Sequence, residues 1–426
     1  MADATLAARH SPLAARGPRP RVAFVTSHPI QYQVPVFRHL AARDDLELLV
    51  LFAMIPDAAA QGAGFGVEFE WDLPLLEGYD YQVLDNVAAH PGVTHYSGCD
   101  TPQIAHVLED QQIDAVVVNG WVVKTCLQTL RACRRLRIPC IVRGEANNLR
   151  PRPWWKRILQ RQLVRRYSAY LPIGNASREF YRSYGISDDR MFPAPYCIEN
   201  DRFATAAERL RIRRDEFRRQ WDIPEDAACY LYCGKFEQKK HPVELVRAFS
   251  KAAAGRSDLH LLMVGDGELK AECERVVEVE GSPVTFAGFL NQTQIVEAYV
   301  AADALVIPSD HGETWGLVVN EAMACGLPAI VSDQVGCAAD LIESGETGWV
   351  FPFGDWDRLS ELLVEYVGAV ADGQMADACR EMVAQYSPAV AAEGIAAAVE
   401  SQWRGMSGER REARSEGGDR RPDRTK

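Results

Sequence analysis

The chain has 426 residues, of which 47% are hydrophobic and 25% are charged, the balance typical of a globular protein. This length favours two domains of about 200 residues each over one hydrophobic core. No apolar run approaches the roughly 18 residues that span a bilayer, so we expect no membrane-spanning helix. The formal net charge of −12 argues against general nucleic-acid binding.

The N-terminal segment lacks the apolar core of a secretory signal. Residues 1–20 mix Ala, Arg, Pro and Asp, which predicts a disordered leader. The chain contains 11 Cys residues, an odd number, and no Cys-x-x-Cys pair. This pattern indicates free, buried thiols in a reducing compartment, and we therefore expect a cytoplasmic location.

Short apolar runs alternate with longer helix-like segments through the first half of the chain. Such alternation predicts a parallel sheet with helices on both faces, and therefore a Rossmann-like doubly wound α/β domain over residues 21–200. The runs that predict its strands are Arg21–Ser27, Leu46–Met54, Asp114–Gly120, Cys140–Glu145 and Tyr170–Gly174.

The first predicted strand is followed by a loop with the sequence Ser27-His28-Pro29-Ile30-Gln31-Tyr32. In open α/β sheets ligands bind at the carboxyl ends of strands, so His28 and Gln31 are candidates for ligand contact. The alternative is a His-Pro turn with a purely structural role.

A basic stretch lies further along the first half. No acidic residue occurs from Ala146 to Arg178, and residues 150–166 combine seven Lys and Arg residues with Trp154 and Trp155. One interpretation is peripheral contact with an anionic membrane or an anionic lipid-linked ligand. The other is a solvated surface helix.

The second half starts a new series of strands, which predicts a second doubly wound domain over residues 201–385. We place the boundary between Tyr196 and Asp215, where strand signals stop and a charged helical stretch, Ala204–Gln220, follows. The last helix, Ser387–Trp403, lies in a segment (386–405) that we expect to pack back on the first domain, and residues 406–426 predict a disordered tail. The predicted strands are Ala228–Gly234, His260–Gly265, Val284–Phe289, Ala304–Ser309 and Ala329–Asp333.

The most informative segment is Ser309–Pro328, in which seven residues separate Glu313 and Glu321. Gly316-Leu317-Val318 can begin a helix, and Gly326-Leu327-Pro328 is a termination signal. Glu313 would then lie in the loop before the helix and Glu321 on it. The amide groups of Gly316 and Leu317 would face an anion, helped by the helix dipole.

This segment resembles the Glu-x7-Glu signature of the retaining glycosyltransferases of family 4, the group 1 glycosyltransferases, which have the GT-B fold. Other elements of that family follow in the same order, at compatible spacings, over about Tyr230 to Asp355. They are Gly234-Lys235-Phe236 with Lys240, Val264-Gly265-Asp266-Gly267-Glu268, Val284-Thr285-Phe286-Ala287-Gly288, Ser332-Asp333 with Val335-Gly336, Asp340-Leu341-Ile342, and Thr347-Gly348. The resemblance implies two Rossmann-like domains that face each other across a cleft.

The resemblance also implies roles for individual residues. Glu313 would contact hydroxyls of the donor sugar, Glu321 those of the ribose, and Lys235 and Lys240 would neutralise the leaving diphosphate. The donor-binding set would further include Gly316, Leu317, Trp315, Val318, Gly265, Gly288 and Arg143. His28 would contact the acceptor or the donor phosphate.

The sequence departs from the family pattern at several positions. Glu145 stands where a family His often follows the strand, so it either replaces that His at the sugar or lies in a differently shaped loop. Lys235 replaces the usual Arg, which keeps the charge but loses the bidentate fork. Trp315 replaces the usual Phe and is expected to pack beside the donor.

The resemblance thus implies a retaining hexosyltransferase with a nucleotide-diphosphate sugar as donor, most simply a UDP- or GDP-sugar, and no cofactor or metal. Asp355-Trp356-Asp357 fits a metal motif, but a helix N-cap at Asp355 explains it better. The acceptor would be a glycan, a lipid-linked saccharide or a small molecule, as in polysaccharide biosynthesis. The alternatives are a nucleotide-sugar epimerase of the same fold and a non-catalytic sugar-nucleotide-binding module.

Overall fold

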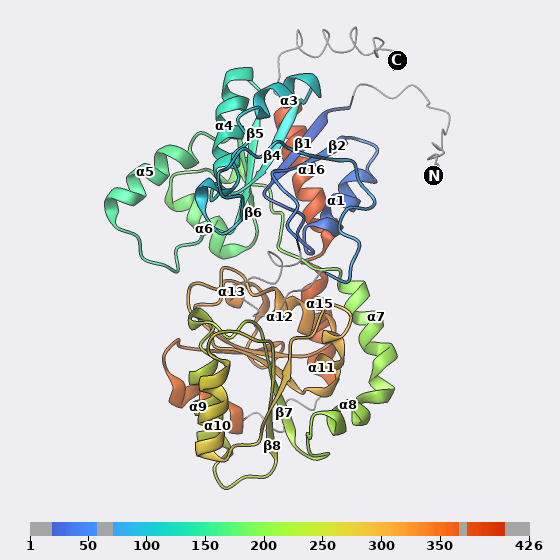
Figure 1. The fold of residues 1–426 in the computed structure, drawn as a ribbon, viewed down its shortest axis with the longest axis vertical. Helices are drawn as coiled ribbons and strands as arrows, with labels where there is room; N and C mark the ends of the chain where they lie inside the picture. The colour runs from blue at the N-terminus through green and yellow to red at the C-terminus, as the bar shows by residue number, and fades with distance from the viewer. Residues whose placement is uncertain (1–18, 58–70, 366–372, 405–426) are drawn as a thin grey trace.

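The computed structural model describes residues 19–57, 71–365 and 373–404. It consists of two α/β domains, stacked along the long axis of the molecule, each built on one parallel sheet (Figure 1). The predicted leader and tail, 1–20 and 406–426, lie almost wholly outside the described residues.

The first sheet has the strand order β3-β2-β1-β4-β5-β6, and all its paired strands are parallel. Phe24, at its centre, is aligned with Val50 on one neighbour and Val117 on the other. All five predicted strands are present, and the sixth, β3, is a short, partly exposed edge strand that the sequence analysis missed. The strands are β1 (Arg21–Thr26), β2 (Glu47–Phe52), β3 (Tyr81–Val83), β4 (Ala115–Asn119), β5 (Cys140–Gly144) and β6 (Ala169–Pro172).

Helices cover both faces of the first sheet, as burial of each strand on two sides requires. They are α1 (Val34–Ala41), α3 (Ile104–Asp110), α4 (Lys124–Leu136), α5 (Trp154–Val164) and α6 (Asn175–Ser183). The last helix of the chain, α16 (Pro388–Arg404), also belongs here, because it contacts α1, β4 and β6. Its Ala-rich face is buried in the same apolar cluster as Phe24 and Phe37.

The second sheet has the order β12-β11-β10-β7-β8-β9 and is again parallel. All five predicted strands are present, and β12 is the one that the sequence analysis missed. The strands are β7 (Ala228–Cys233), β8 (Leu259–Val264), β9 (Val284–Gly288), β10 (Ala304–Ile307), β11 (Ala329–Ser332) and β12 (Gly348–Phe351).

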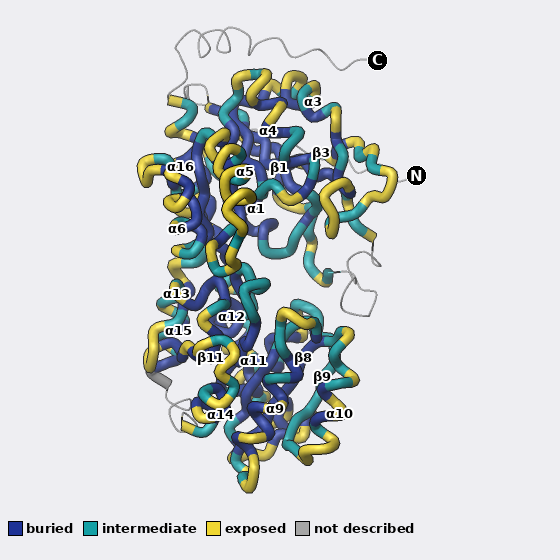
Figure 2. The backbone as a smooth tube through the Cα atoms, turned by 90° about the vertical axis from the view of Figure 1, so that its left-hand side faces the viewer, coloured by how far each residue is buried: buried dark blue, intermediate teal, exposed yellow. Residues whose placement is uncertain are grey.

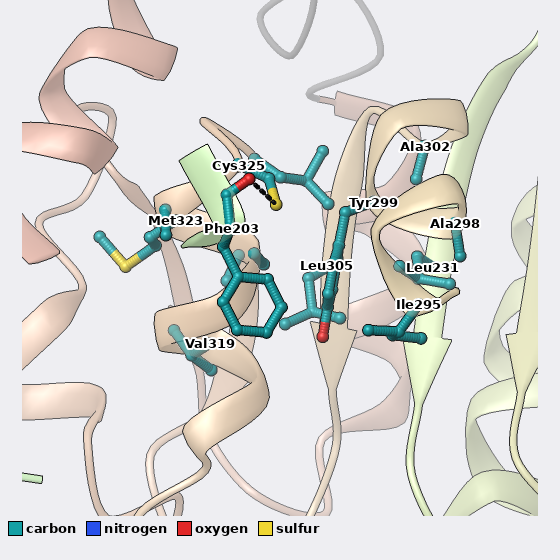
Figure 3. Packing of buried hydrophobic residues seen from close by; sticks show 14 of the residues in the cluster. Phe203, Leu231, Ile295, Ala298, Tyr299, Ala302, Leu305, Val319, Met323 and Cys325 are labelled. Atoms are coloured by element: carbon teal, nitrogen blue, oxygen red, sulfur yellow. Dashed lines mark hydrogen bonds between the residues drawn. The ribbon is translucent and has the colours of Figure 1, made fainter. Parts of the chain in front are cut away.

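The helices of the second domain are α7 (Asn200–Leu210), α8 (Arg214–Gln220), α9 (Pro242–Ala253), α10 (Lys270–Glu280), α11 (Ile295–Ala301), α12 (Leu317–Ala324), α13 (Ala338–Leu341), α14 (Trp356–Glu365) and α15 (Gly373–Ala384). On one face of the sheet, Phe203 of α7 and Tyr299 of α11 pack edge to face with ring centroids 6.3 Å apart (Figure 3). Val319 and Met323 of α12 lie in the same cluster and so fix this helix against the sheet.

Burial follows this architecture. Most strand residues are buried, except in β3 and β9, whereas the outer sides of the helices are exposed (Figure 2). All 11 Cys residues are free thiols and ten of them are buried, as predicted for the thiols themselves. Asp355 directly precedes α14, and its carboxylate accepts a hydrogen bond of 2.9 Å from the backbone N–H of Arg358, which confirms the N-cap.

Candidate functional site

The loop before α12 ends in a glycine that the backbone requires. Gly316 has φ +99°, a left-handed conformation that side chains with a Cβ rarely adopt, and it caps the N-terminus of α12. The helix begins at Leu317 as predicted, so Glu321 lies one turn inside it and Glu313 in the preceding loop. Leu317 and Val318 line a cavity of about 370 Å³ that both domains border.

Glu321 lies in the wall of this cavity with only 8% of its surface exposed. Its carboxylate accepts hydrogen bonds from the Tyr299 hydroxyl, at 2.7 Å, and from the Gln292 side chain, at 3.3 Å. Burial raises the pKa of Glu321, although these two hydrogen bonds act in the opposite direction. The carboxylate is therefore fixed in place, with its orientation set by α11 and by the loop after β9.

Lys235 and Lys240 line the same cavity from the loop after β7. The Lys240 ammonium forms an ion pair with the carboxylate of Glu313, and both side chains are mostly buried. Burial lowers the pKa of Lys235, and the neighbouring Lys239 and Lys240 add to this effect. Glu313 is not among the residues that line the cavity, so in this structure it reaches the cavity through Lys240.

The floor of the cavity is formed where β7, β8 and β9 end side by side. Gly265 lies so close to the preceding strand end that a Cβ there would be 1.9 Å from the carbonyl oxygen of Gly234. The Gly265 N–H donates to the carbonyl of Gly288 at 2.8 Å. Gly234 and Gly265 line the cavity, whereas Gly288 supports it from behind and is followed by Phe289, which does line it.

The first domain contributes the loop after β1 and Trp71 after β2, and of the two candidates in the β1 loop only Gln31 borders the cavity. Gln31, Tyr32 and Trp71 line the cavity, whereas His28 does not. The His28 ring is hydrogen-bonded to the Ser27 hydroxyl at 2.8 Å, and burial lowers its pKa to about 4. His28 is therefore a neutral imidazole near neutral pH, held against its own loop.

Arg143 does not line the cavity, and its contact with the donor stays a prediction. Its side chain is 1% exposed, and its guanidinium donates to the backbone carbonyls of Pro195, at 2.9 Å, and Ala194, at 3.4 Å. It also lies over the ring of Tyr196, 4.8 Å from the ring centroid. The guanidinium therefore lies against the segment 194–196 that leads into the second domain.

Trp315 does not line the cavity either, and its packing beside the donor stays a prediction. It is 2% exposed, and its indole N–H donates to Asn320 at 2.8 Å. The ring occupies space next to Gly174, where a Cβ would lie 2.3 Å from it. Because Gly174 of the first domain has no side chain, the indole of Trp315, which is larger than the usual Phe ring, fits beside it and away from the cavity.

Glu145 lies between the two domains. Its carboxylate accepts a hydrogen bond of 2.7 Å from the hydroxyl of Thr314 in the second domain and a second one from the hydroxyl of Tyr196. It does not line the cavity, so the structure places it beside the signature loop. Its position after β5 agrees with the predicted loop, although the contact with a sugar stays a prediction.

The cavity wall also contains a group of polar residues that were not predicted from the sequence. The guanidinium of Arg202 donates to the side-chain and backbone oxygens of Gln292, at 2.7 Å and 3.1 Å, and Arg202 lies 3.5 Å from Glu199. All three residues line the cavity. They come from the start of α7 and the loop after β9, and the sequence indicated them only through their place after a predicted boundary or strand.

Within the described ranges, no group of three or more His, Cys, Asp or Glu residues is arranged to hold a metal ion. In the same ranges, no helix is long and apolar enough to cross a membrane. The absence of a metal from the donor site therefore stays a prediction.

Comparisons with known proteins agree with this geometry. Residues 213–381 match the family model described as "Glycosyl transferases group 1", which covers most of the second domain. The chain is 33% identical over 123 residues to a GDP-mannose-dependent alpha-(1-6)-phosphatidylinositol dimannoside mannosyltransferase of Mycobacterium tuberculosis. That match covers 29% of this chain and 31% of the relative, so the chain matches about a third of the length of that relative.

Solved structures match over almost the whole chain. HepE of Anabaena, in complex with UDP and glucose, aligns with a TM-score of 0.65 and 16% identity over 90% of this chain and 100% of its own. A glycosyltransferase from Rickettsia africae aligns with a TM-score of 0.69 and 13% identity over 90% and 98%. The chain therefore has the GT-B fold, and its second domain carries the group 1 glycosyltransferase match.

Proposed function

We propose that the protein is a retaining glycosyltransferase, which moves a hexosyl group from a nucleotide-diphosphate sugar to an acceptor. One observation supports this most strongly: Glu321, Lys235 and Lys240 border a single cavity, and Lys240 is paired with Glu313 at its edge. These are the residues that the signature assigns to the ribose, the diphosphate and the sugar. The match of the second domain to group 1 glycosyltransferases supports the same assignment.

The proposed chemistry follows from the charges at the cavity. The bond between the anomeric carbon and the diphosphate oxygen breaks, and the leaving nucleoside diphosphate gains negative charge. Lys235, Lys240 and the N-terminus of α12 stabilise this charge in a site from which closure of the domains excludes water. The acceptor oxygen forms the new bond from the same face, and the leaving phosphate takes its proton, so the configuration is retained.

The donor side of the proposal rests on the second domain. Glu321, held by Tyr299 and Gln292, accepts hydrogen bonds from the ribose hydroxyls, and the loop of Phe289 and Gln292 meets the base. We propose a UDP- or GDP-sugar as donor, since HepE was solved with UDP and the mannosyltransferase is GDP-mannose-dependent. The acceptor, a glycan or lipid-linked saccharide, would enter along the first domain.

The test combines binding and turnover. Purified protein is titrated with UDP, GDP and ADP, with and without EDTA, and its melting temperature is measured, since a ligand of the folded state raises it. Nucleotide release from UDP-glucose and GDP-mannose is then followed, and NMR of the product gives the anomeric configuration. A thermal shift with transfer and retention supports the proposal. Sugar epimerisation without nucleotide release favours the epimerase, and binding without either reaction favours the non-catalytic module.

We further propose that residues 150–166 bring the enzyme to an anionic membrane, at the inner face if the protein is cytoplasmic. The helix α5 projects from the side of the first domain (Figure 1). Four of its apolar side chains are exposed, Trp154 by 73%, Leu159 by 60%, Ile158 by 49% and Trp155 by 47%. An unpaired apolar helix surface of this kind suits the lipid interface.

The charge of α5 fits the same partner. In the described part of the chain, none of the ion pairs uses Lys156, Arg157 or Arg161, and the surrounding stretch has no acidic residue. Each such cation contributes about 1 kcal/mol at an anionic surface. This local positive charge contrasts with the net charge of −12 of the whole chain.

Liposome sedimentation tests this second proposal. The protein should sediment together with vesicles of phosphatidylcholine and phosphatidylglycerol, and it should stay in the supernatant with vesicles of pure phosphatidylcholine. Trp154→Ser combined with Leu159→Ser should abolish pelleting. Ile212→Ser is the matched control, because Ile212 is 92% exposed in the other domain. Equal pelleting with both vesicle types, or equal loss in the control, contradicts the proposal.

A further inference from the structure

Three consecutive side chains of the loop before α12 contact three different parts of the molecule. The Glu313 carboxylate pairs with Lys240 at the edge of the cavity. The Thr314 hydroxyl donates to Glu145 of the first domain at 2.7 Å. The Trp315 ring packs into the junction between the domains. A change in the position of the first domain therefore acts directly on the residue next to Glu313.

The backbone of this loop is held firmly on the second-domain side. The Gly336 N–H donates to the carbonyl of Glu313 at 3.0 Å, and the Cys337 N–H donates to that of Trp315 at 2.9 Å. A Cβ on Gly336 would lie 1.9 Å from the carbonyl oxygen of Thr314, so the two segments are in close contact. The backbone of the loop is thus held by hydrogen bonds within the second domain, and its central side chain, Thr314, is held by the first domain.

Glu145 is itself fixed on the first-domain side. One of its oxygens accepts from Thr314 and the other from the Tyr196 hydroxyl. Tyr196 is 2% exposed and packs between the guanidinium of Arg143 and the ring of Tyr32. Both oxygens therefore already have protein donors, and the residue does not line the cavity.

We propose that Glu145 is a positioning residue, which acts through Thr314 to hold Glu313 beside Lys240 when the two domains are closed. This inference rests on the proposed function, because it assigns Glu145 a task in glycosyl transfer. Separation of the domains breaks the bond between Glu145 and Thr314 and releases the signature loop. The donor-sugar site is then complete only in the closed enzyme, in which water is excluded.

Hydrogen exchange of the unliganded protein is the first test, because it needs no substrate. The segment 310–320 is followed in the wild type, Glu145→Ala, Thr314→Val and Thr314→Ser. Loss of a hydrogen bond to a carboxylate should raise the exchange rate of the protected amides by about ten-fold or more in Glu145→Ala and in Thr314→Val. Thr314→Ser, which keeps the hydroxyl, should behave as the wild type. Unchanged exchange in Thr314→Val overturns the proposal.

A matched control separates this effect from a general loosening of the domain interface. Thr293 in the second domain donates from its backbone N–H, at 3.0 Å, and from its hydroxyl to Asp72. Thr293→Val removes a second Thr hydroxyl that bonds to a carboxylate across the domains, outside the signature loop. Exchange of 310–320 should stay at the wild-type rate in this variant, and an increase equal to that of Thr314→Val overturns the proposal.

Turnover gives the second test. Release of nucleotide from the donor sugar that the wild type accepts should fall by about ten-fold in kcat in both Glu145→Ala and Thr314→Val, with little change in donor KM. The double variant should lose no more than either single one, because both changes break the same bond. A direct contact between Glu145 and the sugar predicts a loss in Glu145→Ala alone, which overturns the positioning role.

The two proposals fail in different ways. If the wild type transfers no sugar, the proposed function fails, while the exchange data still report on the bond between the domains. If the wild type is active and Thr314→Val matches it in exchange and turnover, only the positioning role fails. Should Glu145→Ala not fold, the comparison of Thr314→Val with Thr314→Ser decides the matter alone.

Discussion

The two sheets end on chemically different edges, and the cavity lies between them. The second sheet presents charged groups, namely Lys235, Lys240 and Glu321, with Glu313 behind them. The first presents Gln31 and Tyr32, and His28 beside them is kept neutral by burial. Under the proposed function, the second domain stabilises the negative charge that develops on the leaving diphosphate. The first domain closes the site and orients the loop before α12.

The largest effect that tests this contrast is expected for Lys240. Lys240→Met should lower kcat for nucleotide release by about 10²- to 10³-fold, since removal of one group that stabilises developing charge has an effect of this size. Steady-state kinetics with the donor sugar measures it. Lys251→Met is the control, because Lys251 is exposed and pairs only at the surface with Asp357. Equal activity of the two variants would place the diphosphate elsewhere.

The sequence predicted the second edge well because its signal is local. Glu313, Gly316 and Glu321 lie on one loop and the helix that follows, so their spacing already defines their geometry. Ten of the twelve strands in the described ranges were predicted for a similar reason, as each is an apolar run. The missed strands, β3 and β12, each lie at an edge of their sheet, and β3 has no buried residue.

The first edge could not be predicted in the same way, since its contacts join distant parts of the chain. Glu145 and Thr314 are 169 residues apart, and Arg143 and Pro195 are 52 apart. The resemblance fixed where Arg143 and Trp315 lie along the chain, but not the direction of their side chains. That direction depends on the room beside Gly174 and on carbonyls of the linker, which no sequence pattern records.

Substitution of Arg143 therefore tests whether this residue stabilises the fold or binds the donor. Arg143→Ala should lower the free energy of unfolding by about 2–4 kcal/mol, because it leaves the carbonyls of Ala194 and Pro195 without their buried donor. Urea denaturation measures this change. Arg182→Ala, in the same domain but with exposed ion pairs, should cost less than about 1 kcal/mol. A weaker nucleotide-induced thermal shift in Arg143→Ala would instead support the predicted contact of this residue with the donor.

Glu321 offers a smaller effect, which appears as a pH dependence of donor binding. Burial raises the pKa of this carboxyl above its ordinary value of 4.5. As the pH falls through the raised pKa, the carboxylate takes up a proton and loses capacity to accept from the ribose. The dissociation constant for UDP or GDP, measured by calorimetry, should then rise by about ten-fold in the wild type. Glu321→Gln should bind weakly at every pH in this range.

Stability should show the opposite sign, and this makes the prediction on Glu321 specific. The folded protein binds its proton more readily than the unfolded chain, so the free energy of unfolding falls as the pH rises from 4.5 through the raised pKa. Glu321→Gln lacks this group, and the difference in stability between variant and wild type should grow in its favour over that interval. Denaturation at several pH values measures the difference. A variant that loses both affinity and stability would show that Glu321 supports the fold of α12, and the charged edge of the cavity would then rest on the two lysines and Glu313.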